Sequence, residues 1–422
     1  MTSRAPYQGY KWELLGLLCL AFFLHQADRA IFGVVLPSIQ EDLGLSHKET
    51  GLLGTTLFVA MALMMPVAGY VGDMFSRKWV VTCSLVFWST ATLCTGFTRG
   101  LWGMLMFRSV ATALGESFYA PAAYPLMAAF HKTTRTIAMS IHQTSLYIAL
   151  MVSGVLAGAI ADHWGWRYAF FLYGGAGILL GGLFVFRLKN APVEAMSQGE
   201  AAKPKVKPTE ALSVLLRTPT AVLITISYTA VVLVYNAFVV WAPSFLQAKY
   251  DLSMTKAGGL TMFCQYLPSM VGVLVGGVIS DQLVGRFPRF RLALQTTFML
   301  LCAPAILLLG LGNSLLLTCL GMVALGLFQG TYQSNTPASL FDVIPPRYRS
   351  SALGVEIMIA YLIGSVSPWL LGHMREAMTD GLSYGFAMFS LVYLLGGVAV
   401  GCGALFTFYR DRYVEEAADV AK

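Results

Sequence analysis

The chain has 422 residues, of which 57% are hydrophobic and only 12% are charged. Soluble domains carry about 25% charged residues, so this composition excludes an ordinary water-soluble globular protein. Apolar stretches of about 20 residues, long enough to cross a bilayer as a helix, recur along the whole length. The sequence therefore predicts an all-α polytopic membrane protein that lies in a lipid bilayer.

We predict twelve membrane spans, which in chain order cover residues 12–37, 50–72, 79–98, 101–130, 136–161, 168–187, 219–246, 256–280, 291–311, 314–341, 350–374 and 383–409. The first apolar run is long and no small-residue cleavage site comes after it, so we expect a membrane span there and no cleaved signal peptide.

The net charge is +7, and the distribution of the positive residues indicates how the chain is oriented in the membrane. Of the 28 Lys and Arg residues, six fall in the predicted outer segments, two fall in spans, and the other 20 fall in segments predicted to be cytoplasmic. This bias is the positive-inside rule, and it predicts that both termini are cytoplasmic. We therefore expect a multi-pass protein of the plasma membrane (the bacterial inner membrane), with no nucleic-acid partner.

One long polar segment, residues 188–217, divides the chain. It is rich in Ala, Pro, Lys and Glu and lacks aromatic residues, which is typical of a flexible linker. We predict a six-helix bundle over residues 1–187, a cytoplasmic linker over 188–217 and a second six-helix bundle over 218–422.

The two halves share an internal repeat. GYVGDMFSRK (residues 69–78) ends the second span, and GVISDQLVGR (residues 277–286) ends the eighth with the same Gly-to-Asp spacing. Residues 135–158 and 349–372 align at a shift of 214, which places His142 opposite Glu356. Parallel repeats of this kind place a site at their interface, near the membrane midplane.

GYVGDMFSRK resembles the signature loop of the major facilitator superfamily of secondary transporters, which has the form Gly-x-x-x-Asp-(Arg)-x-(Gly)-Arg-Lys. Met74 and Ser76 replace the usual Arg and Gly, whereas Asp73, Arg77 and Lys78 are kept. With the twelve spans and the repeat, the resemblance covers essentially the whole chain. It implies the major facilitator fold, transport by alternating access, and a monomer.

Three stretches are similar to the anion:cation symporters of that superfamily, which carry sugar acids, phosphorylated sugars and related carboxylates. They are ADR in span one, the Glu- and Pro-bearing span four, and ADHWGWRYAFFLYG from Ala161. Spinster-like lipid transporters also share an Asp-Arg in span one and a Gly-Glu in span four. Both resemblances imply transport roles for the matching Asp28, Arg29 and Glu116.

Four ionisable residues lie at membrane depth in the first half: Asp28, Arg29, Arg108 and Glu116. Charged groups in spans usually mark a pathway or a site. The planar fork of Arg29 suits a substrate carboxylate, and we predict that Asp28 and Glu116, with Arg108 beside them, provide proton coupling. Burial favours a protonated carboxyl group and a nearby arginine favours an ionised one, so an anion on Arg29 would promote proton uptake next door. The alternative is a static lattice that holds the bundle together.

His142 in span five is a candidate for a proton relay or for substrate binding, with helix packing as the alternative. Its repeat partner Glu356 lies about two turns inside span eleven. For Glu356, the alternative to a role like that of His142 is gating on the cytoplasmic side.

The second half offers uncharged polar groups at the aligned positions, which suit substrate hydroxyls. The predicted substrate-binding residues are Arg29, Tyr119, His142, Tyr235, Asn236, Gln265, Tyr266, Gln329 and Tyr332. Helix packing is the alternative for the polar members of this set.

The predicted gating residues are Asp73, Arg77, Lys78, Asp281 and Arg286, at the cytoplasmic mouth. The chain shows no nucleophile–base set, no spaced metal ligands and no phosphate-binding loop, so we expect neither an enzyme nor a cofactor.

The favoured function is proton-coupled symport of a small organic anion, either a sugar acid or another hydroxylated carboxylate. The alternatives are a Spinster-like lysolipid or amphiphile transporter, and a monocarboxylate or drug transporter of the same superfamily. The sequence leaves open the substrate, the choice between proton and sodium, and the direction of transport.

Overall fold

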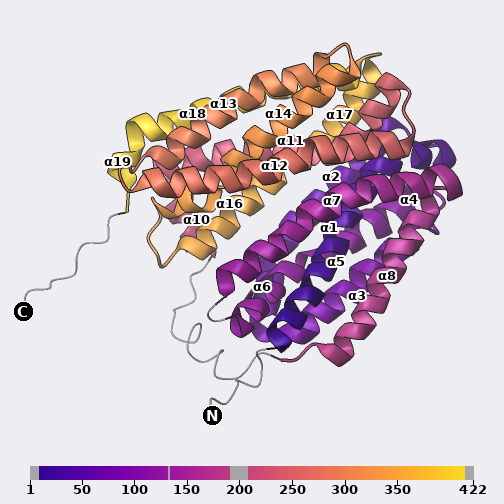
Figure 1. The fold of residues 1–422 in the computed structure, drawn as a ribbon, viewed down its shortest axis with the longest axis horizontal. Helices are drawn as coiled ribbons and strands as arrows, with labels where there is room; N and C mark the ends of the chain where they lie inside the picture. Colours follow the sequence, from indigo (N-terminus) through magenta and orange to yellow (C-terminus); the bar gives the residue numbers. More distant parts are fainter. Residues whose placement is uncertain (1–8, 132–133, 191–207, 414–422) are drawn as a thin grey trace, which may run out of the picture. The chain divides into compact units, whose positions relative to one another are not determined.

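The computed structural model describes residues 9–131, 134–190 and 208–413. Every regular element in these ranges is helical (Figure 1). The helices of the first half are α1 (Tyr10–Leu43), α2 (His47–Met74), α3 (Arg77–Thr95), α4 (Leu101–Met104), the π-helix η1 (Leu105–Ala111), α5 (Thr112–Ser117), α6 (Tyr119–Phe130), α7 (Arg135–Trp164) and α8 (Trp166–Arg187). Those of the second half are α10 (Pro208–Arg217), α11 (Pro219–Tyr250), α12 (Met254–Val284), α13 (Phe290–Leu311), α14 (Leu315–Gln333), α15 (Thr336–Phe341), α16 (Arg349–Gly364), α17 (Val366–Ala377), α18 (Gly381–Cys402), the π-helix η2 (Gly403–Thr407) and α19 (Phe408–Asp411).

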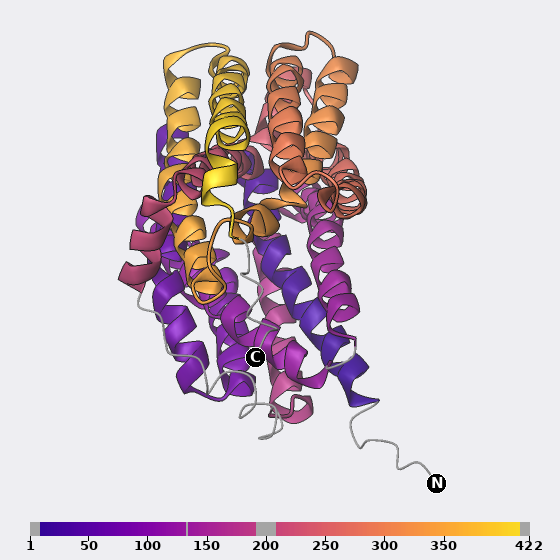
Figure 2. The ribbon, with the colours of Figure 1, turned by 90° about the vertical axis from the view of Figure 1, so that its left-hand side faces the viewer.

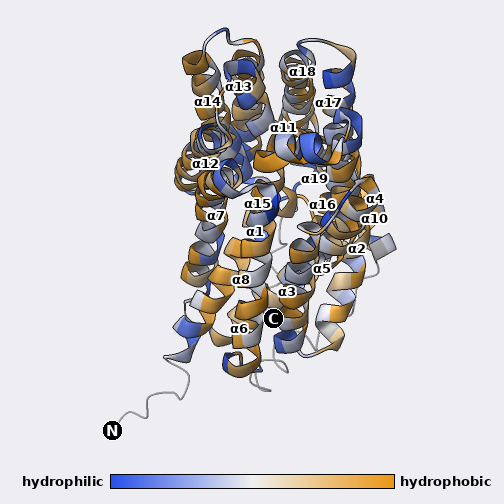
Figure 3. Cartoon of the chain, turned by 90° about the vertical axis from the view of Figure 1, so that its right-hand side faces the viewer, coloured by the Kyte–Doolittle hydropathy of each residue, from blue (hydrophilic) through white to orange (hydrophobic). Residues whose placement is uncertain are grey.

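Ten helical segments in the described ranges are long and apolar enough to cross a membrane, and each coincides with a predicted span. The other two predicted spans, residues 79–98 and 101–130, are also helical. The first is α3, with 19 residues, and the second is divided into α4, η1, α5 and α6. Many large apolar side chains on the helices are exposed, such as Leu179 at 77% and Phe186 at 85%. Hydrophobic residues make up much of the helices, which Figure 3 shows in orange. Such surfaces suit contact with lipid.

The prediction of a flexible linker over 188–217 was wrong at its end, because residues 208–217 form α10. This helix is amphipathic. Ala211 and Leu215 are buried in a hydrophobic cluster with residues of α16 and α18, and Leu216 and Arg217 are exposed. Burial of one apolar face stabilises a short helix that composition alone would assign to a linker. The central part of the predicted linker lies outside the described residues.

The chain packs as two compact units whose limits differ from the predicted halves. The first contains Met1–Lys203, Tyr235–Leu267 and Ser365–Gly385, and the second contains Pro204–Val234, Pro268–Gly364 and Phe386–Lys422. Parts of α11 and α12 and all of α17 thus pack with the first half. The division into two six-helix bundles of common origin stays a prediction.

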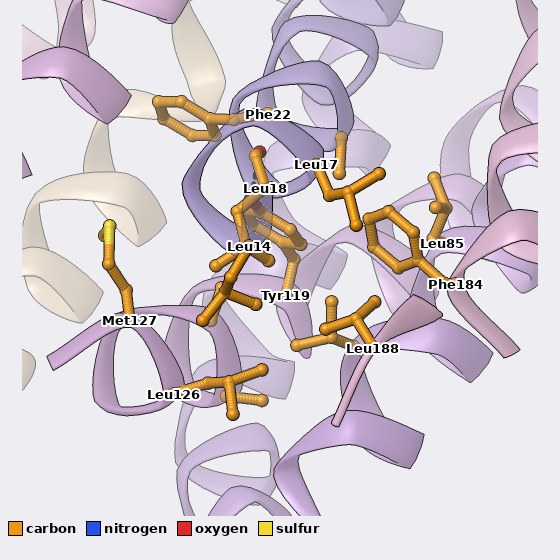
Figure 4. Close-up of a cluster of buried hydrophobic side chains, with 14 of the residues drawn as sticks. Leu14, Leu17, Leu18, Phe22, Leu85, Tyr119, Leu126, Met127, Phe184 and Leu188 are labelled. Carbon is orange, nitrogen blue, oxygen red and sulfur yellow. Dashed lines mark hydrogen bonds between the residues drawn. The ribbon is translucent and has the colours of Figure 1, made fainter. Parts of the chain in front are cut away.

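The first unit has a hydrophobic core near the N-terminal end of α1. In it, α1 packs along α7 and α3 packs along α8, which the indigo-to-magenta helices of Figure 2 show running alongside one another. Leu14 and Leu18 of α1, Leu85 of α3 and Phe184 of α8 are all fully buried in this core. Figure 4 shows their side chains converging around Tyr119 of α6. This packing fixes α1 beside the helices that carry the other charged residues of the site.

The opposite end of the first unit, which we call the far end, is held together by close contacts between helix backbones. A Cβ atom on Gly154 of α7 would lie 2.7 Å from the backbone oxygen of Gly258 in α12, and one on Gly158 would lie 2.6 Å from the backbone of Met254. A larger residue at either position would therefore separate the helices. Trp241 of α11 donates a 2.8 Å hydrogen bond to the carbonyl of Pro368 in α17, which ties these two segments together.

Asp162, in the last turn of α7, caps the N-terminus of α12 at this far end. Its carboxylate accepts hydrogen bonds from the backbone N–H groups of Met254, at 3.1 Å, and Thr255, at 2.9 Å, and from the Thr255 hydroxyl at 2.5 Å. The first N–H groups of a helix have no partner within it, and an anion there also interacts favourably with the helix dipole. Asp162 therefore latches the far end of the first unit.

We expect Asp162→Ala to loosen this latch. Loss of a helix cap destabilises by about 1 kcal/mol, which corresponds to roughly a fivefold shift in an opening equilibrium. A cysteine placed at Ser38, whose hydroxyl contacts the Met254 sulfur at 3.1 Å, should then react about five times faster with a membrane-impermeant maleimide. The matched control is Asp380→Ala, which changes an exposed aspartate at the same end. Equal labelling rates in the two variants would show that Asp162 does not keep the far end of the first unit closed.

Candidate functional site

Two adjacent residues of α1 each form a buried ion pair with the fourth predicted span. Asp28 Oδ2 lies 3.2 Å from Arg108 Nη1, and Arg29 Nη2 lies 3.1 Å from Glu116 Oε2. All four side chains are at most 7% exposed. The structure thus brings together the four charged residues singled out in the sequence, and two bases against two acids leave the cluster with no net formal charge. Such balance is what makes burial of ions tolerable.

The Asp28–Arg108 pair is held at both carboxylate oxygens of Asp28, whereas Nε of Arg108 is buried without a hydrogen-bond partner among the described residues. Thr92 of α3 donates a 2.9 Å hydrogen bond to Asp28 Oδ1, so both carboxylate oxygens have a donor. Arg108 also donates from Nη2 to the Asp28 carbonyl at 3.2 Å, and its guanidinium lies 4.9 Å from the centre of the Phe32 ring. A pair with this many fixed contacts positions its neighbours and resists exchange.

The Arg29–Glu116 pair is instead incomplete on the carboxylate side. Both Nε and Nη2 of Arg29 lie 3.1 Å from the same oxygen, Glu116 Oε2. Within the described residues, the other carboxylate oxygen of Glu116 is buried without a hydrogen-bond partner. Arg29 thus meets Glu116 on one oxygen instead of two. A ligand carboxylate that offered both of its oxygens to the guanidinium would match it better.

The π-helix η1 explains how Arg108 and Glu116 both reach α1. In the unbroken α-helix expected from the sequence, a separation of eight residues leaves the two side chains about 80° apart. Residues 105–111 instead form a π-helical segment that contains Arg108. A π-turn accommodates an extra residue and rotates the next part of the helix, and such turns are frequent at functional sites. The helix changes again at Phe118, between α5 and α6.

His25, which the sequence offers as an accessory to Asp28 and Arg29, is a member of the cluster. Its Nε2 lies 3.3 Å from the Glu116 carbonyl and 3.8 Å from Glu116 Oε2, and Gln26 Nε2 lies 3.1 Å from its Nδ1. The Gln26 amide is a donor and the Glu116 carbonyl is an acceptor, so we assign a neutral imidazole that carries its proton on Nε2. One turn of α1 separates His25 from Arg29, which is the signal that points to it. Thr92 and Met61, which Arg29 Nη2 contacts at 3.4 Å, had no such signal.

Tyr119 and His142 form a separate buried pair deeper in the hydrophobic core. The Tyr119 hydroxyl donates to the Leu18 carbonyl at 2.7 Å and lies 2.9 Å from His142 Nε2. Because the tyrosine proton is already used, Nε2 of His142 must be the donor in the second contact. The His142 ring stacks on Phe22 at 4.3 Å between centroids. These contacts give both residues a packing role, and their binding of substrate stays a prediction.

The predicted polar residues of the second half divide between the two units. Tyr235, Asn236, Gln265 and Tyr266 belong to the first unit, whereas Gln329 and Tyr332 belong to the second. Asn236 is fully buried, and neither atom of its amide has a hydrogen-bond partner among the described residues. The Tyr332 hydroxyl donates to Ser227 Oγ at 3.0 Å. Their roles toward a substrate stay predictions.

The predicted gating residues lie at helix ends. Lys78 Nζ donates to the Val185 carbonyl at the end of α8, at 2.9 Å, and Arg77 begins α3. The side chain of Asp73 lies outside the described part of the structure. In the second half, Asp281 lies 3.9 Å from Arg291, a residue that was not among those predicted from the sequence.

Arg291 is the centre of that second group of charges. It binds both carboxylate oxygens of Asp342, at 2.9 and 3.0 Å. Arg286, the other gating residue predicted in the second half, has its guanidinium 5.5 Å from the ring centre of the adjacent Phe287. Gating by any of these residues stays a prediction.

The family model that describes the Major Facilitator Superfamily matches residues 18–368. The chain belongs to this superfamily. It is therefore a multi-pass membrane transporter and not an enzyme.

Among curated proteins, this major facilitator is 27% identical to protein spinster homolog 3 of Danio rerio, over 97% of this chain and 86% of the relative. It is 26% identical to an MFS-type efflux pump of Mycolicibacterium smegmatis, over 99% of this chain and 98% of that one. Among solved structures, it is similar to a bacterial homolog of the human lysosomal transporter Spinster in an inward-facing, unoccupied conformation. The TM-score is 0.79 at 20% identity, over 97% of this chain and 100% of that chain. A D-xylose–proton symporter has a TM-score of 0.74 at 15% identity, over 93% and 97% of the two chains. These structural likenesses concern the fold.

Proposed function

We propose that this transporter carries a small organic anion together with a proton, and that the anion is a sugar acid or another hydroxylated carboxylate. The observation that carries the proposal is the incomplete Arg29–Glu116 pair, in which two guanidinium nitrogens share one carboxylate oxygen. Arg29 is the anion-binding group, and Glu116 is the carboxyl group that the substrate displaces.

The exchange works through ordinary electrostatics. A substrate carboxylate binds the guanidinium of Arg29 through both oxygens, which gives two charge-assisted hydrogen bonds. Glu116 then loses its counter-ion while it stays buried, and an isolated buried carboxylate favours the neutral acid. One anion and one proton therefore enter the site together. When the anion leaves, Glu116 returns to Arg29 and releases the proton.

The charges balance at each stage. The empty cluster has two cations and two anions, so its formal charge is zero. After exchange, Arg29 pairs with the substrate, Arg108 still pairs with Asp28, and Glu116 is neutral, so the formal charge is again zero. A buried site that never gains net charge avoids the cost of a lone ion in the membrane interior. For a monoanion the transport cycle is electroneutral.

We further place both termini in the cytoplasm of a plasma-membrane protein, because of the positive-inside rule. The far end that Asp162 latches then faces outward, and the first unit corresponds to an outwardly closed state of alternating access. The contacts of Gly154 and Gly158 with α12 support this assignment.

A second candidate is the transport of an acidic amphiphile, such as a lysolipid. Similarity to spinster homologs along 97% of the chain favours it, as does the Asp-Arg and Gly-Glu pattern at Asp28, Arg29 and Glu116. The exchange at Arg29 is the same for either substrate, since both carry an acidic group. The two candidates differ in the body of the molecule.

A thermal-shift screen of the purified protein tests both candidates. The panel contains gluconate, glucuronate and lactate, glucose as an uncharged match, and lysophosphatidate with monooleoylglycerol as its uncharged match. A ligand at 100 times its Kd stabilises the folded state by about 2.7 kcal/mol. We expect the sugar acids to raise the melting temperature and glucose to leave it unchanged.

Uptake into proteoliposomes then tests the coupling. A compound that binds should accumulate when the external side is made more acidic, and accumulation that ignores the pH gradient would refute proton symport. A shift caused only by lysophosphatidate would replace the sugar acid with an amphiphile.

A further inference from the structure

The second half of the chain contains a buried carboxyl group that the Arg29 exchange does not use. Glu356 of α16 has no exposed surface, and within the described residues neither of its carboxylate oxygens has a hydrogen-bond partner. By contrast, Asp28 and Glu116, the buried carboxylates of the first unit, each lie against an arginine. The gating role considered for Glu356 from the sequence stays a prediction.

The surroundings of Glu356 supply no cation among the described residues. The charged residues of the packed elements point elsewhere: Arg349 of α16 donates to the Ile344 carbonyl, and Arg291 of α13 binds Asp342. On α10, which packs against α16, Glu210 and Arg217 are exposed. The titratable groups that face this region are Tyr332 of α14, which interacts electrostatically with Glu356, and beyond it Cys302 of α13 and Tyr393 of α18.

Tyr332 is suited to accept a hydrogen bond from a protonated Glu356. Its hydroxyl proton is already donated to Ser227 Oγ at 3.0 Å, so its oxygen offers lone pairs to a neighbour. A protonated carboxyl group can donate to such an oxygen, whereas a carboxylate can only accept. The polarity of the site therefore fits the neutral acid and opposes the anion.

The internal repeat gives this arrangement a counterpart. Tyr332 and Glu356 align with Tyr119 and His142 of the first half. Tyr119 likewise donates its proton to the first helix of its half, at the Leu18 carbonyl, and accepts from His142. Each half thus has a titratable group at the same aligned position and a tyrosine whose own proton is donated elsewhere, and of the two pairs the structure shows a hydrogen bond in Tyr119–His142. In the second half the titratable group is an acid.

We propose that Glu356 is a proton-binding site of the second half, separate from the Arg29–Glu116 exchange and loaded with a proton in the conformation described. Deprotonation requires the carboxylate to reach water or a donor, so proton release from Glu356 is linked to a rearrangement of α16 against α14. The inference goes beyond the proposed function, because it depends on neither the substrate nor its coupling.

Infrared spectroscopy of the purified protein tests the proposal without a substrate. At neutral pH, the carbonyl band of protonated carboxyl groups should lose one component in Glu356→Gln. Glu210→Gln, the same substitution at an exposed glutamate of the same half, should keep it. Raising the pH of the unmodified protein should remove this component reversibly. Tyr332→Phe should move the band without removing it, because the substitution takes away the polar hydroxyl that interacts with Glu356 and leaves the acid in place.

Two infrared results would overturn the proposal that Glu356 binds a proton. Identical bands in the unmodified protein and Glu356→Gln would show that Glu356 is ionised and would overturn the proposal. A component that persists to the highest pH at which the protein stays folded would also overturn it, because the acid would then never exchange its proton. If Glu356→Gln does not fold, the pH titration and Tyr332→Phe decide the question. Uptake that ignores a pH gradient would refute the proposed symport and leave these spectra unaffected.

Discussion

Replacement of Arg29 with alanine is expected to abolish transport and to destabilise the protein by about 3–5 kcal/mol, the usual cost of leaving one member of a buried ion pair alone. The uncompensated group is Glu116, which is 0% exposed and pairs with Arg29 at 3.1 Å. Uptake into proteoliposomes of the compound found by thermal shift measures the first effect, and the melting temperature in detergent measures the second.

The double variant Arg29→Ala/Glu116→Gln separates binding from folding. Removal of both charges leaves no buried ion of this pair, so most of the lost stability should return. Transport should stay absent, because the anion-binding group is still missing. Recovery of uptake together with stability would show that Arg29 only holds the bundle together, as in the static lattice that the sequence left open.

The sequence predicted the fold because its signals are repeated along the chain. The apolar spans, the half repeat and GYVGDMFSRK each point to the same superfamily, and the described helices and the family match confirm it. The membership of the charged cluster was also predictable, since ionised groups in apolar spans have few places to lie other than beside each other.

The pairing within that cluster was not predictable. It depends on η1, and no residue in 105–111 distinguishes a π-turn from an α-turn by composition. Asp162 had no signal either, because its partners are backbone N–H groups of α12, far away in sequence. The complete burial of Glu356 had no signal in the sequence, because position along a span says little about which face of the helix is covered. Contacts made by backbone and by helix faces are three-dimensional, and a linear pattern does not contain them.

Glu116→Gln is expected to uncouple substrate from proton. The amide is neutral at every pH, so Arg29 has no competing anion and no proton enters when substrate binds. With an imposed gradient of one pH unit, an electroneutral one-to-one symporter accumulates its substrate about tenfold, since 1.4 kcal/mol corresponds to a factor of ten. The variant should equilibrate the substrate across the membrane without accumulation. Radiolabelled substrate in proteoliposomes measures both quantities.

Asp28→Asn is the matched control, because it neutralises the other carboxylate of the same cluster. Asp28→Asn leaves Arg108 without its anionic partner. In the proposed exchange the substrate binds Arg29, so it does not take the place of Asp28 beside Thr92 and Arg108. A bound substrate anion should therefore restore the melting temperature of Glu116→Gln, where it pairs with Arg29, more than that of Asp28→Asn. If Glu116→Gln still accumulates substrate in response to the pH gradient, the proton is carried elsewhere and the exchange at Arg29 is wrong.

The proposed cycle moves no net charge with a monoanion. Clamping the membrane potential should therefore leave accumulation by the unmodified protein unchanged. A dependence on potential would contradict the charge balance that links Glu116 to Arg29.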